Sequence, residues 1–231
     1  MHDPAPKRGP LTPREWVISG IFLAILLGLF AASIFYDFSP VKLSALLVIL
    51  YWIPLLVVHE AGHAFVARAL GWHVGQVVLG MGRTLAEFRI GRATVEVRLL
   101  PIEGFVASVP TNLRWPRIKS AAIYFAGPGA DLLVAAAVLL LVGPDRLLSA
   151  SEDYGLIAWQ SLALAAVSQG VLNLIPHSVR TPEREIPNDG LGILRSFGLP
   201  ESYYAGLIGQ RYNQQDRGWE SRDPADSRNR S

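Results

Sequence analysis

The sequence predicts a mostly α-helical, polytopic membrane protein with four transmembrane helices and a small β-hairpin or re-entrant insertion between the second and the third. Hydrophobic residues make up 51% of the 231 positions and charged residues only 17%, whereas an ordinary soluble domain has about 25% charged residues. Four apolar stretches are also long enough to cross a hydrocarbon core, which requires roughly 20 helical residues. These predicted spans cover residues 17–36, 43–70, 120–142 and 156–175.

The composition excludes several kinds of site and partner. The chain has no cysteine, so a metal must be bound by imidazole, carboxylate or water, and neither a disulfide nor an iron–sulfur cluster can form. The net charge of +2 is small, and the basic residues lie beside apolar segments instead of forming a patch with stacking aromatic residues. We therefore expect the lipid bilayer as a partner and no nucleic acid.

The first apolar stretch is expected to stay in the protein as a membrane anchor. Residues 17–36 are too long for the apolar core of a signal peptide, which has about 7 to 15 residues. The sequence then divides into a cytoplasmic N-terminal segment 1–16, a membrane domain 17–209 and a tail 210–231. Polar and charged residues dominate this tail, so we expect it to be a disordered cytoplasmic segment.

Lysine and arginine gather in two of the segments that flank the predicted spans. Short loops rich in these residues stay on the cytoplasmic side, so both termini and the insertion between the second and third spans are expected to be cytoplasmic. The other two connecting loops are poorer in basic residues. The basic residues on the expected cytoplasmic side are Lys7, Arg8, Arg14, Arg83, Arg89, Arg92, Arg98, Arg114, Arg117 and Lys119.

The insertion at residues 72–116 has the patterning of β structure. Apolar and polar residues alternate over 87–90 and again over 95–99, which is typical of strands. Gly91-Arg92 lies between these two runs and suits a two-residue hairpin turn. The apolar segment 100–106 that follows is too short to span the bilayer, so we expect either a re-entrant loop or an ordinary surface loop.

The second predicted span contains the run His59-Glu60-Ala61-Gly62-His63. Histidines four residues apart project from the same face of a helix, so both imidazoles can bind one Zn²⁺ at roughly 2.0 to 2.1 Å. Glu60 then lies beside the metal without being a ligand, where it can activate a zinc-bound water for attack on a peptide carbonyl. Ionisable residues in an apolar span are costly and are functional by default. The run therefore predicts a catalytic centre with one Zn²⁺ per chain.

A third protein ligand is expected, because catalytic zinc usually has three protein ligands and one open position. Two aspartates are candidates. Asp189 lies beyond the fourth span, on the expected cytoplasmic side, where it could also cap a short helix. Asp131 lies inside the third span. We predict Asp189 as the third ligand and keep Asp131 as the alternative metal ligand.

Further motifs follow the histidine run in a recognisable order: Gly127-Pro128, then Asn173-Leu174-Ile175-Pro176, then Asp189-Gly190. With these motifs, residues 43–196 resemble the site-2 protease family of intramembrane zinc metalloproteases. The resemblance implies that the aspartate of the Asp-Gly motif is the third zinc ligand. The segment Leu100 to Val106 is also similar to a Gly-Gly-Tyr-Val-type loop beside the family's active site, with Glu103 in place of the first glycine.

Two features depart from the family pattern. The stretch from Asn173 to Asp189 is longer than the compact family version, and Asp131 stands where the family more often has asparagine. The resemblance also implies that Asn173 faces the substrate or supports the transition state by stabilising a developing oxyanion. A hydrogen bond between helices is an equally good interpretation of this amide.

These observations together predict an intramembrane zinc endopeptidase that hydrolyses peptide bonds in or near a transmembrane segment of a substrate protein. The expected partners are a membrane-protein substrate and a regulatory membrane partner that the sequence does not identify. The active site is expected to face the cytoplasmic side. The alternative is a non-catalytic zinc-binding membrane protein of the same fold that binds or sequesters membrane partners.

Overall fold

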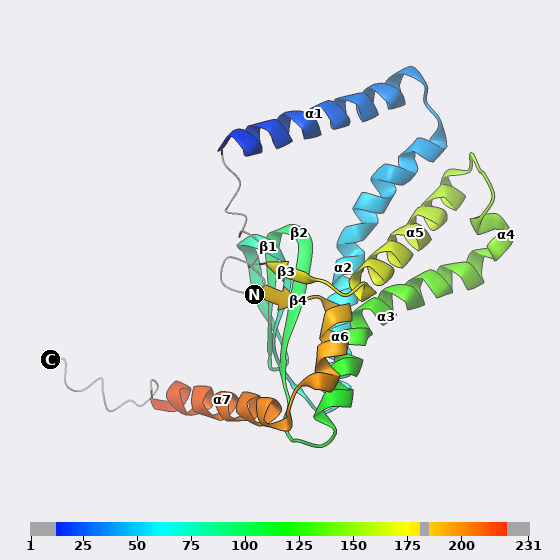
Figure 1. The fold of residues 1–231 in the computed structure, drawn as a ribbon. Coiled ribbons are helices and arrows are strands. Elements are labelled where there is room, and N and C mark those ends of the chain that lie inside the picture. The colour runs from blue at the N-terminus through cyan, green and yellow to red at the C-terminus, as the bar shows by residue number, and fades with distance from the viewer. Residues whose placement is uncertain (1–12, 181–184, 221–231) are drawn as a thin grey trace, which may run out of the picture.

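The protein is described by a computed structural model that covers residues 13–180 and 185–220. Figure 1 shows a bundle of long helices, a twisted β-sheet beside one of them, and a C-terminal helical segment at the base of the bundle. The elements in chain order are α1 (Pro13–Tyr36), η1 (Pro40–Lys42), α2 (Leu43–Ala69), β1 (His73–Ile90), β2 (Ala93–Val109), α3 (Pro116–Val142), α4 (Pro144–Leu147), α5 (Tyr154–Leu174), β3 (Ser178–Arg180), β4 (Glu185–Pro187), α6 (Asp189–Gly198) and α7 (Glu201–Glu220).

Three helical segments within the described residues are long and apolar enough to cross a membrane: Pro40–Ala69, Pro116–Val142 and Tyr154–Leu174. They coincide with the second, third and fourth predicted spans. The prediction of a largely helical protein with membrane-spanning helices is thus confirmed for these three segments. The first predicted span, 17–36, lies within α1, which extends away from the bundle (Figure 1). This helix is not among the three candidates, and the count of four spans stays a prediction.

Helices α2, α3 and α5 pack against one another to form the centre of the protein. Small residues permit this close packing. Leu55 on α2 packs against three buried alanines of α3 and α5: Ala135, Ala165 and Ala166. At Gly62 on α2, an added Cβ would lie 2.6 Å from the carbonyl oxygen of Ala126 on α3. Close approach through small residues is typical of helices that pack in membranes.

The predicted hairpin turn at Gly91-Arg92 is confirmed. Ile90 pairs with Ala93 across the turn, and Gly91 has a φ of 63°, a backbone conformation that glycine adopts without steric cost. The strands are much longer than the sequence patterning indicated, with 18 residues in β1 and 17 in β2. Residues Gln76–Leu79 pair with β2 twice, with Thr94–Val97 and with the segment from Gly104 to Ala107.

Residues 100–106 form part of strand β2, so the expectation of a loop, re-entrant or surface, is wrong. Gly104 pairs with Leu79 and Phe105 with Val78. This pairing satisfies backbone groups that an unpaired loop at membrane depth would leave open. The indole Nε1 of Trp52 on α2 donates to the carbonyl oxygen of Ile102 at 3.4 Å, so this segment lies directly alongside α2.

One apolar cluster joins the sheet to the base of the bundle. It combines side chains from the C-terminal turn of α2, both strands, α3 and α7: Ala67, Trp72, Val74, Val77, Ala93, Val95, Ile123 and Tyr204. Because burying apolar surface is the main favourable contribution to such packing, this cluster holds the sheet against the C-terminal end of α2.

The C-terminal part is more regular than the sequence indicated. Helix α7 continues to Glu220, whereas the sequence predicted a disordered tail from residue 210. Its first turns are held by packing, since Tyr204 is 1% exposed and donates through its hydroxyl to the carbonyl oxygen of Ser196 at 3.2 Å. Residues 1–12 of the predicted N-terminal segment and 221–231 of the predicted tail lie outside the described residues.

Candidate metal centre

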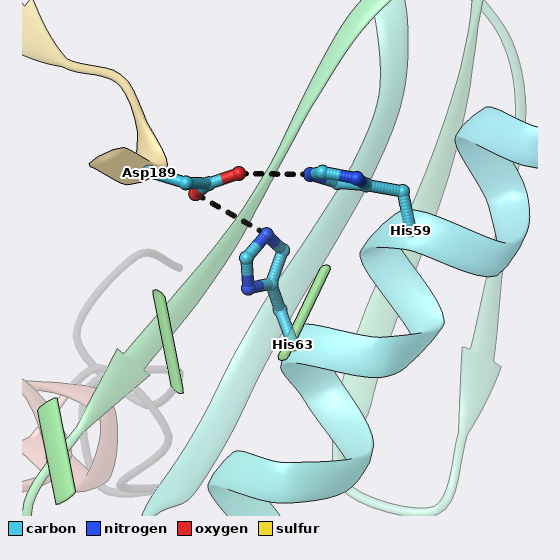
Figure 2. Close-up of side chains that lie close together, drawn as sticks. All are labelled: His59, His63 and Asp189. Atoms are coloured by element: carbon cyan, nitrogen blue, oxygen red, sulfur yellow. Dashed lines mark hydrogen bonds and ion pairs between the residues drawn. The ribbon is translucent and has the colours of Figure 1, made fainter. Parts of the chain in front are cut away.

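The two histidines of the sequence motif lie on successive turns of α2 and face Asp189, the first residue of α6 (Figure 2). The Nε2 atom of His59 lies 2.9 Å from Oδ2 of Asp189, and the Nε2 atom of His63 lies 3.3 Å from Oδ1. Each of the three residues offers one ligand atom, and these three atoms all lie within 4.8 Å of one another. The structure thus brings together the three residues that the sequence suggested as zinc ligands.

The other ring nitrogen of each histidine already has a hydrogen-bond partner. Nδ1 of His63 lies 2.6 Å from the carbonyl oxygen of Ile123, and Nδ1 of His59 lies 2.7 Å from Oδ2 of Asp131. A carbonyl oxygen only accepts hydrogen bonds, so Nδ1 of His63 must carry a proton, and an ionised Asp131 imposes the same tautomer on His59. In both neutral rings the lone pair is then on Nε2, the atom that faces Asp189.

This arrangement of lone pairs fits a bound cation. Two imidazole lone pairs directed at a carboxylate repel it unless a positive charge lies between them. Two ligand atoms of a tetrahedral zinc ion, each about 2.0 to 2.1 Å from the metal, are about 3.4 Å apart. The separations of 2.9 and 3.3 Å between Asp189 and the two rings approach this value. The donor set of two imidazoles and one carboxylate is also a common one for catalytic zinc.

Gly127 on α3 leaves the space that such an ion needs. An added Cβ at Gly127 would collide with Nε2 of His63 and would lie 2.6 Å from Nε2 of His59. Any side chain at this position would therefore enter the space that the two ligand nitrogens face. The sequence marked Gly127 only as part of a Gly-Pro motif, and its relation to the histidines requires the packing of α3 on α2.

Glu60 is a buried carboxylate beside the histidines. Glu60 is 4% exposed. Its Oε2 atom has no hydrogen-bond partner within the described part of the chain. On its other side lies strand β2, where an added Cβ at Gly104 would be 2.6 Å from Oε1 of Glu60. A buried, unpaired carboxylate oxygen is costly, and it is available to accept a proton or a hydrogen bond from a bound molecule.

Asp131 lies behind the ring of His59, on the side opposite Asp189. It is completely buried and contacts Nδ1 of His59. Gln169 on α5 donates through Nε2 to the other carboxylate oxygen of Asp131 at 3.4 Å. Carboxylates in this position orient metal-binding histidines and increase their basicity. The sequence analysis missed Gln169, although a polar side chain within an apolar helix was a usable signal.

Asn188, not Asp189, caps helix α6, so the expectation that Asp189 caps it is wrong. The side-chain oxygen of Asn188 accepts from the backbone N–H of Leu191 at 3.1 Å, and its amide donates to Ile175 and Asn173 carbonyl oxygens at 2.8 and 2.9 Å. Asn188 therefore ties the start of α6 to the end of α5 and leaves the Asp189 carboxylate free to face the histidines. The sequence analysis did not identify this residue.

The ionisation of Asp189 follows from its surroundings. Burial alone would raise the pKa of this carboxyl group, but hydrogen bonds and positive charge from protonated rings of His59 and His63 outweigh burial and lower the pKa below the ordinary value of aspartate. A metal cation in the place of those ring protons would act in the same direction. Positive charge between Asp189 and the two rings thus favours the anionic form of this carboxyl group. An anionic carboxylate is also the form that binds a divalent cation.

Asn173 lies near the end of α5, and its amide donates to the carbonyl oxygen of Gln169, one turn earlier in the same helix, at 3.1 Å. Its own carbonyl oxygen accepts from Asn188. The residue thus helps to hold the segment that leads to Asp189. The predicted contact with a substrate stays a prediction.

Comparison with known proteins finds a family whose sequence resembles part of this chain. The sequence model of peptidase family M50 matches residues 45–152, which include the histidine run, the sheet and Asp131. This part of the chain is similar to peptidase family M50. The resemblance to site-2 proteases is thereby confirmed, while Asn173 and Asp189 lie beyond the matched residues.

Several proteins that resemble this chain carry metalloprotease names. A putative zinc metalloprotease of Clostridium perfringens is 40% identical over 52 residues, 22% of this chain and 16% of that protein. A putative zinc metalloprotease of Nostoc sp. is 33% identical over 99 residues, 37% of this chain and 27% of that protein. The zinc metalloprotease Rip1 of Mycobacterium bovis is 30% identical over 104 residues, 38% of this chain and 26% of that protein.

The chain matches only a small part of each of these relatives, with 16%, 27% and 26% of their lengths covered. The similarity to peptidase family M50 and the names of the relatives support a zinc metalloprotease. The metal-centre geometry of this chain agrees with that class, because it presents two imidazoles and a carboxylate around a space kept open by a glycine.

Proposed function

We propose that this chain is an intramembrane zinc endopeptidase that hydrolyses a peptide bond in or near a transmembrane segment of a substrate protein. The observation that carries the proposal is the position of the centre: His59, Glu60 and His63 are buried within a helical segment, Pro40–Ala69, that is long and apolar enough to span a membrane. A soluble metalloprotease has no need for such a helix.

In this proposal one Zn²⁺ is held by Nε2 of His59, Nε2 of His63 and the carboxylate of Asp189. When bound, zinc would polarise the scissile carbonyl group and make water more acidic. Asp131 and the carbonyl group of Ile123 hold the two imidazoles in the tautomer that leaves Nε2 free. Gln169 in turn holds Asp131. Asp131 is thus assigned a positioning role, and Asp189 is preferred as the third ligand.

Glu60 is proposed as the general base and then the general acid. Its unpaired Oε2 atom accepts a proton from the attacking water as the water oxygen bonds to the carbonyl carbon. The same proton then passes to the amide nitrogen as the carbon–nitrogen bond breaks, so that a carboxylic acid and an amine are released. A proton carrier with no competing partner in the site suits both transfers.

The alternative function, a non-catalytic zinc-binding membrane protein that sequesters partners, is less well supported. Such a protein has no need to bury Glu60 with a free oxygen next to the ligands, because an unpaired buried carboxylate oxygen destabilises the fold. The test is a cleavage assay on the full chain in detergent micelles, with single-span membrane peptides as substrates and mass spectrometry of the products. Cleavage that 1,10-phenanthroline abolishes and added Zn²⁺ restores supports the proposal; stoichiometric zinc without cleavage of any peptide contradicts it.

Substitution of the two aspartates is expected to separate a ligand from a positioning residue. Asp189→Ala should lose stoichiometric zinc and cleavage together, because the ion keeps only two protein ligands. Asp131→Asn should still bind zinc, with an affinity roughly 10- to 100-fold lower, because only the support of His59 is weakened. Zinc titration by fluorescence competition measures both effects. Full zinc affinity in Asp189→Ala with complete zinc loss in Asp131→Asn would reverse the two assignments.

We further propose that the centre opens toward the cytoplasm, with both termini on that side. His63 is six residues before the end of α2 at Ala69, about 9 Å along the helix axis. The segment that connects α2 to α3, which includes β1 and β2, is rich in Arg and Lys. The chain has no cysteine, so single cysteines report topology without background. A membrane-impermeant maleimide should label Asn112→Cys only from the cytoplasmic side and Ser149→Cys only from the opposite side; the reverse pattern contradicts the orientation.

A further inference from the structure

A surface cavity lies where α2 ends and α3 begins, at the base of the bundle. It has a volume of about 410 Å³ and is lined by Ala69, Leu70, Arg114, Trp115, Ile118 and Lys119. Two of these lining residues are cationic and the others are apolar. The cavity is separate from the metal centre, since none of its lining residues belongs to that centre.

The loop that forms one side of the cavity is held in place by its own hydrogen bonds. The hydroxyl group of Thr111 donates to the carbonyl oxygen of Gly71 at 2.6 Å, which ties the loop to the end of α2. The side-chain oxygen of Asn112 accepts from the backbone N–H of Arg114 at 3.0 Å. Lys119 extends the same structure, because its backbone N–H donates to the carbonyl oxygen of Trp115 in the first turn of α3. The backbone positions of both cationic residues are thus held by these hydrogen bonds.

The positive charge of the cavity is not neutralised by the protein. Within residues 13–180 and 185–220, no ion pair involves the side chain of Arg114 or Lys119. The surrounding segment 110–119 also contains no aspartate or glutamate, and Arg117 adds a further cation. Two cations facing one cavity repel each other and favour an anionic ligand.

The cavity lies at the level where two candidate membrane spans end. The segment Pro40–Ala69 finishes at the cavity and the span Pro116–Val142 starts there. Trp115 is 64% exposed and Ile118 is 53% exposed, and exposed aromatic and apolar side chains beside cations are typical of the membrane interface. A ligand at this level meets phosphate groups on one side and acyl chains on the other.

We propose that this cavity binds the headgroup of an anionic phospholipid. The lipid phosphate would lie between Arg114 and Lys119, and its glycerol and upper acyl chain would contact Leu70, Trp115 and Ile118. Basic pockets between transmembrane helices recognise anionic headgroups in this way. The apolar part of the lining favours a lipid over a free phosphate ion, which would leave that surface unused. The inference is independent of the proposed proteolysis.

The test is native mass spectrometry of the full chain in detergent, titrated with phosphatidylglycerol and, separately, with phosphatidylcholine. Wild type should retain phosphatidylglycerol in preference to phosphatidylcholine. Arg114→Gln combined with Lys119→Gln should weaken phosphatidylglycerol binding about 30-fold, the loss expected for two interfacial charges. Binding of phosphatidylcholine and zinc content should not change, which shows that this double variant is folded.

A matched control removes two exposed cations of β1 outside the cavity, Arg83→Gln with Arg89→Gln, and should change phosphatidylglycerol affinity less than about threefold. The charge-preserving pair Arg114→Lys with Lys119→Arg should retain most of the wild-type affinity. Equal losses in the cavity and control variants would overturn the proposal, since they would show a diffuse charge effect. Equal affinity of wild type for the two lipids, or displacement of phosphatidylglycerol by millimolar inorganic phosphate, would also overturn it.

Discussion

Replacement of Glu60 by glutamine is expected to abolish peptide cleavage while zinc remains bound. Glutamine has nearly the same size as glutamate, so the contact with Gly104 and the packing of α2 against the sheet should be preserved. The amide cannot accept and return the proton, and loss of a positioned general base typically costs about 10² to 10⁴-fold in rate. Inductively coupled plasma mass spectrometry should still find one zinc per chain.

The matched control for Glu60→Gln is Glu87→Gln, which makes the same chemical change at an exposed position on β1. It should retain wild-type cleavage. Wild-type cleavage by Glu60→Gln would contradict the assigned mechanism, because no proton transfer through Glu60 would then be required. Loss of zinc from Glu60→Gln would instead show that Glu60 is needed for metal binding.

Replacement of Gly127 by alanine is expected to remove zinc and activity together. The added methyl group would occupy the space that the Nε2 atoms of His59 and His63 face. Both rings are fixed from behind by hydrogen bonds at Nδ1, so neither can turn away without losing a buried partner. We expect zinc affinity to fall by more than about 100-fold, beyond the usual effect of losing a residue that only supports a ligand.

Gly129→Ala is the matched control for Gly127→Ala, two residues along the same helix. Its added Cβ would meet Cε1 of Phe125 at 3.2 Å, and this ring is 51% exposed and free to shift. The control should bind zinc normally. Circular dichroism and thermal unfolding distinguish loss of the metal from loss of the fold. Normal zinc binding by a folded Gly127→Ala protein would show that the ion does not occupy this space.

The sequence predicted the features that depend on residues near one another in the chain. The four-residue spacing of His59 and His63 places both on one helix face, whatever the rest of the fold. The apolar lengths of three spans and the turn at Gly91-Arg92 are similarly local. By contrast, residues 100–106 are locally ambiguous, because an apolar segment becomes a strand only where another strand is available to pair with it.

The tail and the cap of α6 are two further features that depend on contacts with distant parts of the chain. Polar composition indicated disorder from residue 210, yet α7 continues to Glu220, after initial turns that Tyr204 anchors by packing in the core. The sequence predicted Asp189 both as the third ligand and as the cap of α6, but the adjacent and chemically similar Asn188 is the cap. The contacts of Asn188 with the end of α5 decide between them.

By itself, the sequence determined that this is a membrane protein with a His-Glu-x-x-His helix inside a span. Only the tertiary structure decided how the remaining parts of the centre are arranged. Asp189 and Asp131 are separated from His59 by 130 and 72 residues, and both are carboxylates near apolar segments. Their different places, one at Nε2 and the other at Nδ1 of the same ring, follow from the packing of α3 and α6 around α2. Local residue patterns carry no information about such packing, because it depends on contacts between segments far apart in the chain.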